Sequence, residues 1–287
     1  MRRVSSPPIV VPALILSSLV VLSACDRGQA PAADAPSSQA AGGTPEPGTP
    51  EPAPAPEPVE LKDVSEVTSD YVVGITYPPS AMKYPGLAAE LKRYADDARE
   101  DLMQAVAART EGEAATLYDL SLTFTEVANT PQLFAIAADG SSYTGGAHSS
   151  PLLARFVWLP EQQQRLRITD LFPADGDGWA EIASQVRESL HTALSQRLDA
   201  DELSPGERER MMRDARRMIE DGTGPEAENY SEFEPVVGRD GRIEAIRFVF
   251  PPYQVGPYSD GEQVVQLPAS ALLPYVAEQY RKLFSTR

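Results

Sequence analysis

The chain has 287 residues, with 25 basic against 42 acidic side chains and a formal net charge of −17. A polyanion repels nucleic acid and anionic lipid surfaces at long range and attracts cationic partners, so we expect no nucleic-acid binding. Acidity also keeps an exported protein soluble, and composition alone does not separate the two interpretations. Cys25 is the single cysteine, which excludes an internal disulfide.

The N-terminus has the pattern of a bacterial lipoprotein leader. Arg2 and Arg3 precede an apolar stretch over 9–22, which is too short to span a bilayer as a helix. The stretch ends in Leu-Ser-Ala-Cys, the lipobox pattern, with Cys25 at its last position. We therefore predict a signal peptide over 1–24 and lipidation of Cys25, with palmitate among the attached chains. The alternative is an ordinary secretory leader that carries an accidental cysteine.

The segment that follows predicts a spacer. Residues 26–58 contain nine prolines and almost no bulky apolar side chain, so 25–58 is expected to be a lipidated cysteine followed by a disordered linker. Polyproline II at about 3.1 Å per residue would extend it to roughly 100 Å. Asp26 favours retention at the inner membrane. The expected location is the cell envelope, with the folded part anchored by lipid and facing the periplasm.

Residues 59–287 have globular composition and predict an α+β fold, an antiparallel sheet with packed helices, divided into interleaved halves at about 59–172 and 173–287. Three-four spacing of apolar residues predicts helices near 87–102 and 179–194. Period-two or β-branched runs predict strands. These strands lie near 71–77, 120–125, 133–137, 152–158, 165–168, 233–237, 243–250 and 264–267.

Two further segments carry specific expectations. The turn Gly238-Arg239-Asp240-Gly241 predicts a hairpin between the two strands that flank it, and 268–280 predicts a closing helix. Residues 199–229 resemble an insertion. Its helix, 206–220, carries a thin stripe that includes Met211, Met212 and Ile219. The stripe suits either an adaptable contact surface or a surface helix that packs its narrow side.

Catalytic and metal-binding patterns are scarce. The sequence contains no Gly-x-Ser-x-Gly, no His-Glu-x-x-His, and no cluster with zinc-ligand spacing. Asp175-Gly176-Asp177-Gly178 matches only part of the calcium-binding loop pattern, and it instead favours a turn before a helix. His191 lies beside an apolar helical stripe and is expected to be structural. We predict a non-enzymatic protein without cofactor or metal.

The second histidine has a more distinctive setting. His148 ends Tyr143-Thr144-Gly145-Gly146-Ala147-His148, in which the paired glycines allow a backbone turn that larger residues resist. One interpretation is a tight inter-strand turn whose histidine makes a local hydrogen bond. The other places Tyr143 and His148 at the rim of a recognition surface.

That segment, followed by Ile168-Thr169-Asp170-Leu171-Phe172 and by Phe248-Val249-Phe250-Pro251-Pro252-Tyr253-Gln254-Val255-Gly256-Pro257-Tyr258, resembles the RsiV-like extracytoplasmic domain family. The family includes the sensor part of a lysozyme-sensing anti-sigma factor and the non-catalytic N-terminal part of some peptidoglycan deacetylases. The resemblance implies an α+β domain that binds a cell-envelope ligand. It does not map the family's ligand-contacting residues onto this sequence. The candidate ligand-binding residues, taken from the two blocks themselves, are Tyr143, Gly145, Gly146, His148, Tyr253 and Tyr258.

Three functions compete at this point. The favoured one is a membrane-tethered, non-enzymatic binding module for a lysozyme-like cationic protein or a peptidoglycan fragment. The chain shows no anti-sigma segment and no deacetylase domain, so neither of those roles follows from the resemblance. The alternatives are a cell-wall enzyme using carboxylates such as Asp170 with His148 or a tyrosine, and a structural lipoprotein of envelope assembly.

Overall fold

The computed structural model describes residues 59–109, 116–173, 178–200 and 203–286. The signal peptide, Cys25, the proline-rich linker and residues 175–177 lie outside the described residues. Every element named below belongs to one compact unit, 54–287. Within the described residues, none of the helices combines the length and apolarity that crossing a bilayer requires.

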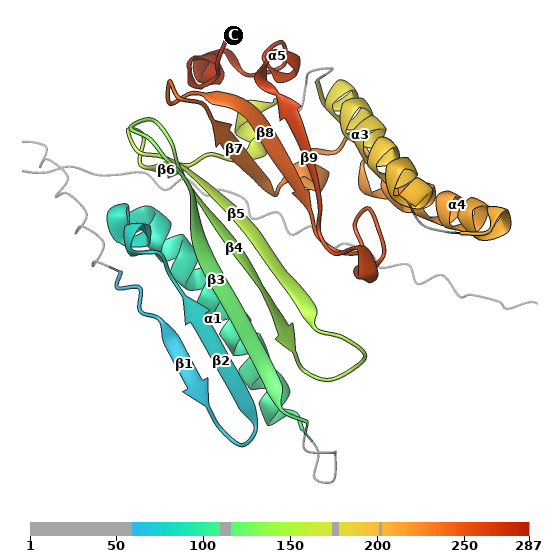
Figure 1. Cartoon of the computed structure of the whole chain (residues 1–287). Helices are drawn as coiled ribbons and strands as arrows, with labels where there is room; N and C mark the ends of the chain where they lie inside the picture. Colours follow the sequence, from blue (N-terminus) through green and yellow to red (C-terminus); the bar gives the residue numbers. More distant parts are fainter. Residues whose placement is uncertain (1–58, 110–115, 174–177, 201–202, 287) are drawn as a thin grey trace, which may run out of the picture. The chain divides into compact units, whose positions relative to one another are not determined.

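The first half of this unit is a six-stranded sheet with strand order β1-β2-β3-β4-β5-β6 (Figure 1). Neighbouring strands are antiparallel except β2 and β3, which are parallel. Helix α1 connects this parallel pair. The strands are β1 (Val64–Val67), β2 (Tyr71–Thr76), β3 (Tyr118–Asn129), β4 (Phe134–Tyr143), β5 (Ser150–Leu159) and β6 (Gln164–Arg165).

Helix α1 (Pro85–Ala107) covers one face of this sheet and follows the short 3-10 helix η1 (Pro79–Lys83). Leu87, Leu91 and Leu102 recur at helical spacing and are fully buried. They pack with inward-facing residues of β3, β4 and β5 in one hydrophobic cluster. The amphipathic period therefore explains both the helix and the face it buries.

The second half contains a three-stranded antiparallel sheet, β7-β8-β9, and a pair of helices. The strands are β7 (Phe233–Val237), β8 (Ile243–Phe250) and β9 (Gln263–Pro268). Helices α3 (Gly178–Ala200) and α4 (Pro205–Gly222) pack against each other, and α3 also packs against β9. The shorter elements are α2 (Ile168–Leu171), η2 (Ala227–Tyr230), η3 (Tyr258–Asp260), α5 (Ala269–Leu272) and η4 (Glu278–Leu283).

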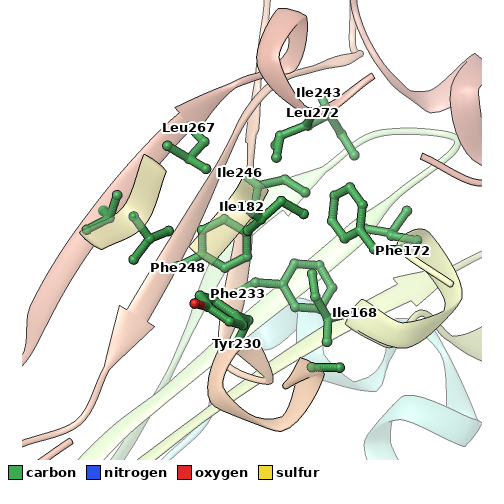
Figure 2. Close-up of a cluster of buried hydrophobic side chains, with 14 of the residues drawn as sticks. Ile168, Phe172, Ile182, Tyr230, Phe233, Ile243, Ile246, Phe248, Leu267 and Leu272 are labelled. Carbon is green, nitrogen blue, oxygen red and sulfur yellow. The ribbon is translucent and has the colours of Figure 1, made fainter. Parts of the chain in front are cut away.

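A second hydrophobic cluster joins the two halves. Figure 2 shows its centre, where Phe233 and Phe248 of the small sheet pack with Ile168 and Phe172 of the α2 segment and with Ile182 of α3. The same cluster includes Ala135 and Val157 from the large sheet and Leu133 just before β4, and β7 packs against β3, β4 and β5. The start of β4 and the end of β5 are thus buried on both faces, as their continuous apolar runs allow.

The predicted α+β class with antiparallel sheets is confirmed, and most predicted elements are present. The hairpin at 233–250 forms as expected, with Gly241 at a φ of 78° in the turn. In α4, Met212, Ala215 and Ile219 pack toward the core while Met211 is 45% exposed, so the helix packs its narrow side.

Two element predictions were wrong. The alternation at 165–168 continues as strand only to Arg165, because Ile168 begins α2 and the Asp170 carboxylate accepts the Arg167 N–H at 2.7 Å as a cap. The closing helix over 268–280 is interrupted. Helix α5 ends at Leu272 and η4 begins at Glu278, with Pro274 between them unable to donate to a continuing helix.

Candidate functional site

The first part of the candidate site is the loop between β4 and β5, residues 144–149. Gly145 and Gly146 have φ values of 101° and 97°, a region that side-chain-bearing residues rarely adopt. The Tyr143 hydroxyl donates a hydrogen bond to the Gly146 carbonyl at 3.1 Å. Tyr143, Gly145 and Gly146 therefore set the shape of the loop, and the loop places His148 at its far end.

The second part is the loop between β8 and β9, residues 251–262. Tyr253 has a φ of 74°, and its N–H donates to the Gly256 carbonyl at 2.9 Å. The Gln254 side-chain amide donates to the carbonyls of Gly222 (3.0 Å) and Asn229 (2.8 Å), at the ends of α4 and η2. Val255 is buried beside them. These contacts hold the loop in one conformation in which Tyr253 faces outward.

Three rings from the two loops meet, and we call His148, Tyr253 and Tyr258 the aromatic cluster. His148 stacks on Tyr258 with ring centroids 4.0 Å apart and planes 15° apart. The Tyr253 hydroxyl lies 2.7 Å from His148 Nε2, and the two tyrosine centroids are 5.8 Å apart. Since the partners are 105 residues apart in sequence, the cluster ties the large sheet to the small one.

The hydrogen bonds of His148 define its chemical role in the cluster. Nδ1 lies 3.2 Å from the Ser149 carbonyl, which can only accept, so Nδ1 carries the hydrogen. In the neutral ring Nε2 is then the acceptor for the Tyr253 hydroxyl. Tyr253 is 54% exposed and His148 is exposed as well, so both side chains stay accessible to a partner.

An ionic network around a buried arginine links β4, β5 and β7 with the end of the β8–β9 loop. Arg155 of β5 is only 4% exposed, and its Nε lies 2.6 Å from Glu234 Oε1 of β7. Its Nη1 pairs with Asp139 of β4 at 2.8 Å, and its Nη2 lies 3.9 Å from Glu262 beside β9. The backbone N–H of Arg155 donates to Glu232 Oε2 at 2.6 Å. Both sheets and the loop that carries Tyr253 are thus joined through one side chain.

Residues 169–270 match the DUF3298 family model, described as a protein family of unknown function. The match spans α3, α4 and the small sheet. It includes Tyr253 and Tyr258 but not His148, so the DUF3298 region supplies two of the three rings and the preceding large sheet supplies the third.

Two solved structures of DUF3298 proteins are similar to this chain. One, from Bacteroides fragilis NCTC 9343, is 14% identical, covers 79% of this chain and 96% of its own, and has a TM-score of 0.48. The other, from Pseudomonas aeruginosa PAO1, is 15% identical, covers 80% of this chain and 99% of its own, and has a TM-score of 0.47. No curated protein matches the sequence.

Asp170 and His191 lie outside the aromatic cluster. Asp170, offered as a catalytic carboxylate, caps α2 through the Arg167 N–H. His191 lies on α3, where burial and then the Arg216 charge hold its pKa below the usual range. Within the described residues, no group of three or more His, Cys, Asp or Glu side chains is arranged to hold a metal ion.

The sequence missed Arg155 and the network around it. A lone arginine inside the apolar run 152–158 gives no sign of burial, because its acidic partners come from β4, β7 and the β8–β9 loop. The only indication in the sequence was the position of Arg155 within an apolar strand. An inward-facing charge in a strand that is otherwise buried requires a partner.

Proposed function

We propose that this protein is a lipid-anchored protein of the bacterial cell envelope whose folded part binds a cationic envelope protein, such as a lysozyme, through the aromatic cluster. The observation that carries the proposal is the convergence of His148, Tyr253 and Tyr258 from two distant loops onto one exposed surface. The leader, Cys25 and the proline-rich spacer support the location, and the resemblance to the RsiV-like family supports the kind of ligand.

The shape of the cluster favours a macromolecular partner. Small molecules are usually enclosed in concave pockets, whereas these rings lie at the surface with Tyr253 more than half exposed. Tyrosine supplies a large contact area with few rotatable bonds, which makes it a frequent anchor in protein interfaces. The two glycines and the anchored Gln254 hold the rings in place before binding, so little ordering entropy is lost.

Charge favours a basic partner over an acidic one. The net charge of −17 steers a cationic protein toward the surface and accelerates association at low salt. A lysine or arginine of the partner can also lie over the face of Tyr253, an interaction of about 0.5–2 kcal/mol. Electrostatic steering and an aromatic anchor would then act on the same partner.

A pull-down with immobilised lysozyme at low and moderate salt tests the proposal. We expect retention that weakens at moderate salt because long-range attraction is screened. Tyr253→Ala should lower the affinity by on the order of tenfold, as truncation of an interface anchor does. Met82→Ala is the matched control, since Met82 is 49% exposed and lies outside both loops.

The alternatives give different outcomes in the same experiment. No retention at either salt concentration would refute the protein-ligand proposal. Retention on insoluble peptidoglycan, lost in Tyr253→Ala, would assign the cluster to a wall fragment instead. Release of soluble fragments from peptidoglycan would favour the enzyme alternative. Retention by lysozyme that is unchanged in Tyr253→Ala would place the binding surface elsewhere.

A further inference from the structure

A second feature, separate from the aromatic cluster, is a cavity at the junction of the two halves. It has a volume of about 290 Å³ and lies where β5, β6 and the start of α2 meet the segment 227–233. Buried Leu166 and Phe233 form apolar wall, and Figure 2 shows Phe233 close to Ile168, another wall residue. We call this space the junction cavity.

Both signs of charge line the junction cavity, and part of that charge is already satisfied. Arg165 pairs with Glu90 at 3.1 Å and donates to the Arg155 carbonyl at 2.8 Å. Arg167 and Glu228 are exposed lining residues. Among the residues that the structure describes, neither has an ion-pair partner within 4.0 Å. The cavity therefore offers one guanidinium and one carboxylate to a ligand.

Glu232 supplies a third charge, farther from solvent. Its Oε2 accepts the Arg155 N–H at 2.6 Å, but the part of the chain described here places no basic side chain within ion-pair distance of it. Burial raises the pKa of this carboxyl, while the more distant charges of Arg165 and Arg155 only oppose that effect. Glu232 is half-buried, and a carboxylate in such a place, without an ion-pair partner, is stabilised by an ammonium group that approaches it with good hydrogen-bond geometry.

We propose that the junction cavity binds a small zwitterion, an α-amino acid or a short peptide. The ligand ammonium would be held by Glu232 and Glu228, its carboxylate by Arg167, and its apolar side chain by the Leu166 and Phe233 wall. Guanidinium groups suit carboxylates because they donate two parallel hydrogen bonds. The volume lies at the low end for ligand pockets, which limits the occupant to a small molecule. This proposal is independent of the macromolecular partner at the aromatic cluster.

Calorimetric titration of the mature, unlipidated chain (Cys25→Ser) with dialanine, in L,L and D,D forms, tests the site. N-acetyl-dialanine lacks the ammonium and dialanine amide lacks the carboxylate, so each should bind on the order of tenfold more weakly than the parent, the usual loss for a charged hydrogen bond. Glu232→Gln keeps an oxygen acceptor for the Arg155 N–H and should weaken dialanine by a similar factor. Arg167→Gln should do the same.

Matched controls and contrary outcomes complete the test. Glu220→Gln and Arg210→Gln, both exposed on α4, should leave the affinity unchanged. Absence of binding by both forms of dialanine at millimolar concentration would overturn the proposal. Binding that survives Glu232→Gln and Arg167→Gln would also overturn it. Equal affinity for dialanine and its amide would show a cation site and refute the role given to Arg167.

Discussion

Replacing Arg155 with methionine tests whether one buried guanidinium joins the two sheets. Removing one partner of a buried ion pair costs about 3–5 kcal/mol, because the other charge is left in a poorly solvated place. Here Glu234 is only 10% exposed but keeps Arg247 at 3.1 Å, and Asp139 is 48% exposed and can be hydrated. We therefore expect a loss at the lower end, about 3 kcal/mol of unfolding free energy.

Urea denaturation of residues 25–287 carrying Cys25→Ser, followed by circular dichroism, measures that loss. Adding Glu234→Gln to Arg155→Met removes a carboxylate that is only 10% exposed and leaves Arg247, which is 42% exposed and can be hydrated. The double variant should therefore recover about 1 kcal/mol or more. Arg239→Met, at an exposed turn position, is the control and should stay within about 0.5 kcal/mol of the parent. A loss below about 1 kcal/mol for Arg155→Met, or a double variant no more stable than the single one, would refute the reasoning.

Two further predictions come from contacts in the structure, and a third comes from the lipobox pattern at Cys25. In Gly222→Ala the new Cβ would lie 2.0 Å from the Gln254 carbonyl oxygen, so thermal denaturation should show a loss of about 2–4 kcal/mol, whereas Gly206→Ala, with open space around it, should be neutral or stabilising. Burial raises the folded-state pKa of Glu232 above its unfolded value, so the folded state retains the proton longer. Relative to Glu232→Gln, the parent should therefore lose stability in urea titrations as the pH rises above about 4.3, and a constant difference would contradict this. Cys25→Ser should abolish palmitate labelling and move the protein from the membrane pellet to the supernatant; unchanged labelling would rule out lipidation at that residue.

Local sequence patterns predicted most of the secondary structure because the spacing of apolar residues and the turn residues largely determine it. The segments 233–237 and 243–250 contain alternating or continuous apolar residues on either side of a glycine-containing turn, and the two strands pair as expected. The helix near 87–102 followed from its apolar spacing. Two parallel neighbouring strands need a crossover connection such as a helix. The position of this helix between two predicted strands was therefore an indication, which the sequence prediction did not use, that β2 and β3 are parallel.

Tertiary pairings account for what the sequence did not predict. The sequence offered His148, Tyr253 and Tyr258 as separate candidates. Their contacts depend on how the two sheets pack, and a short stretch of sequence holds no information about that packing. The same holds for Arg155, whose burial depends on acids from three other segments. At Ile168 a side-chain cap from Asp170 prevailed over a period-two pattern.

The histidines allow a direct test of the aromatic cluster as a binding surface. The chain contains only two, so a ¹⁵N-labelled sample gives two sets of imidazole signals, one from the exposed His148 and one from His191 on α3. Titration with unlabelled lysozyme should shift or broaden the His148 signals and leave those of His191 in place. Binding that leaves His148 unperturbed, or that moves only His191, would contradict the proposed surface.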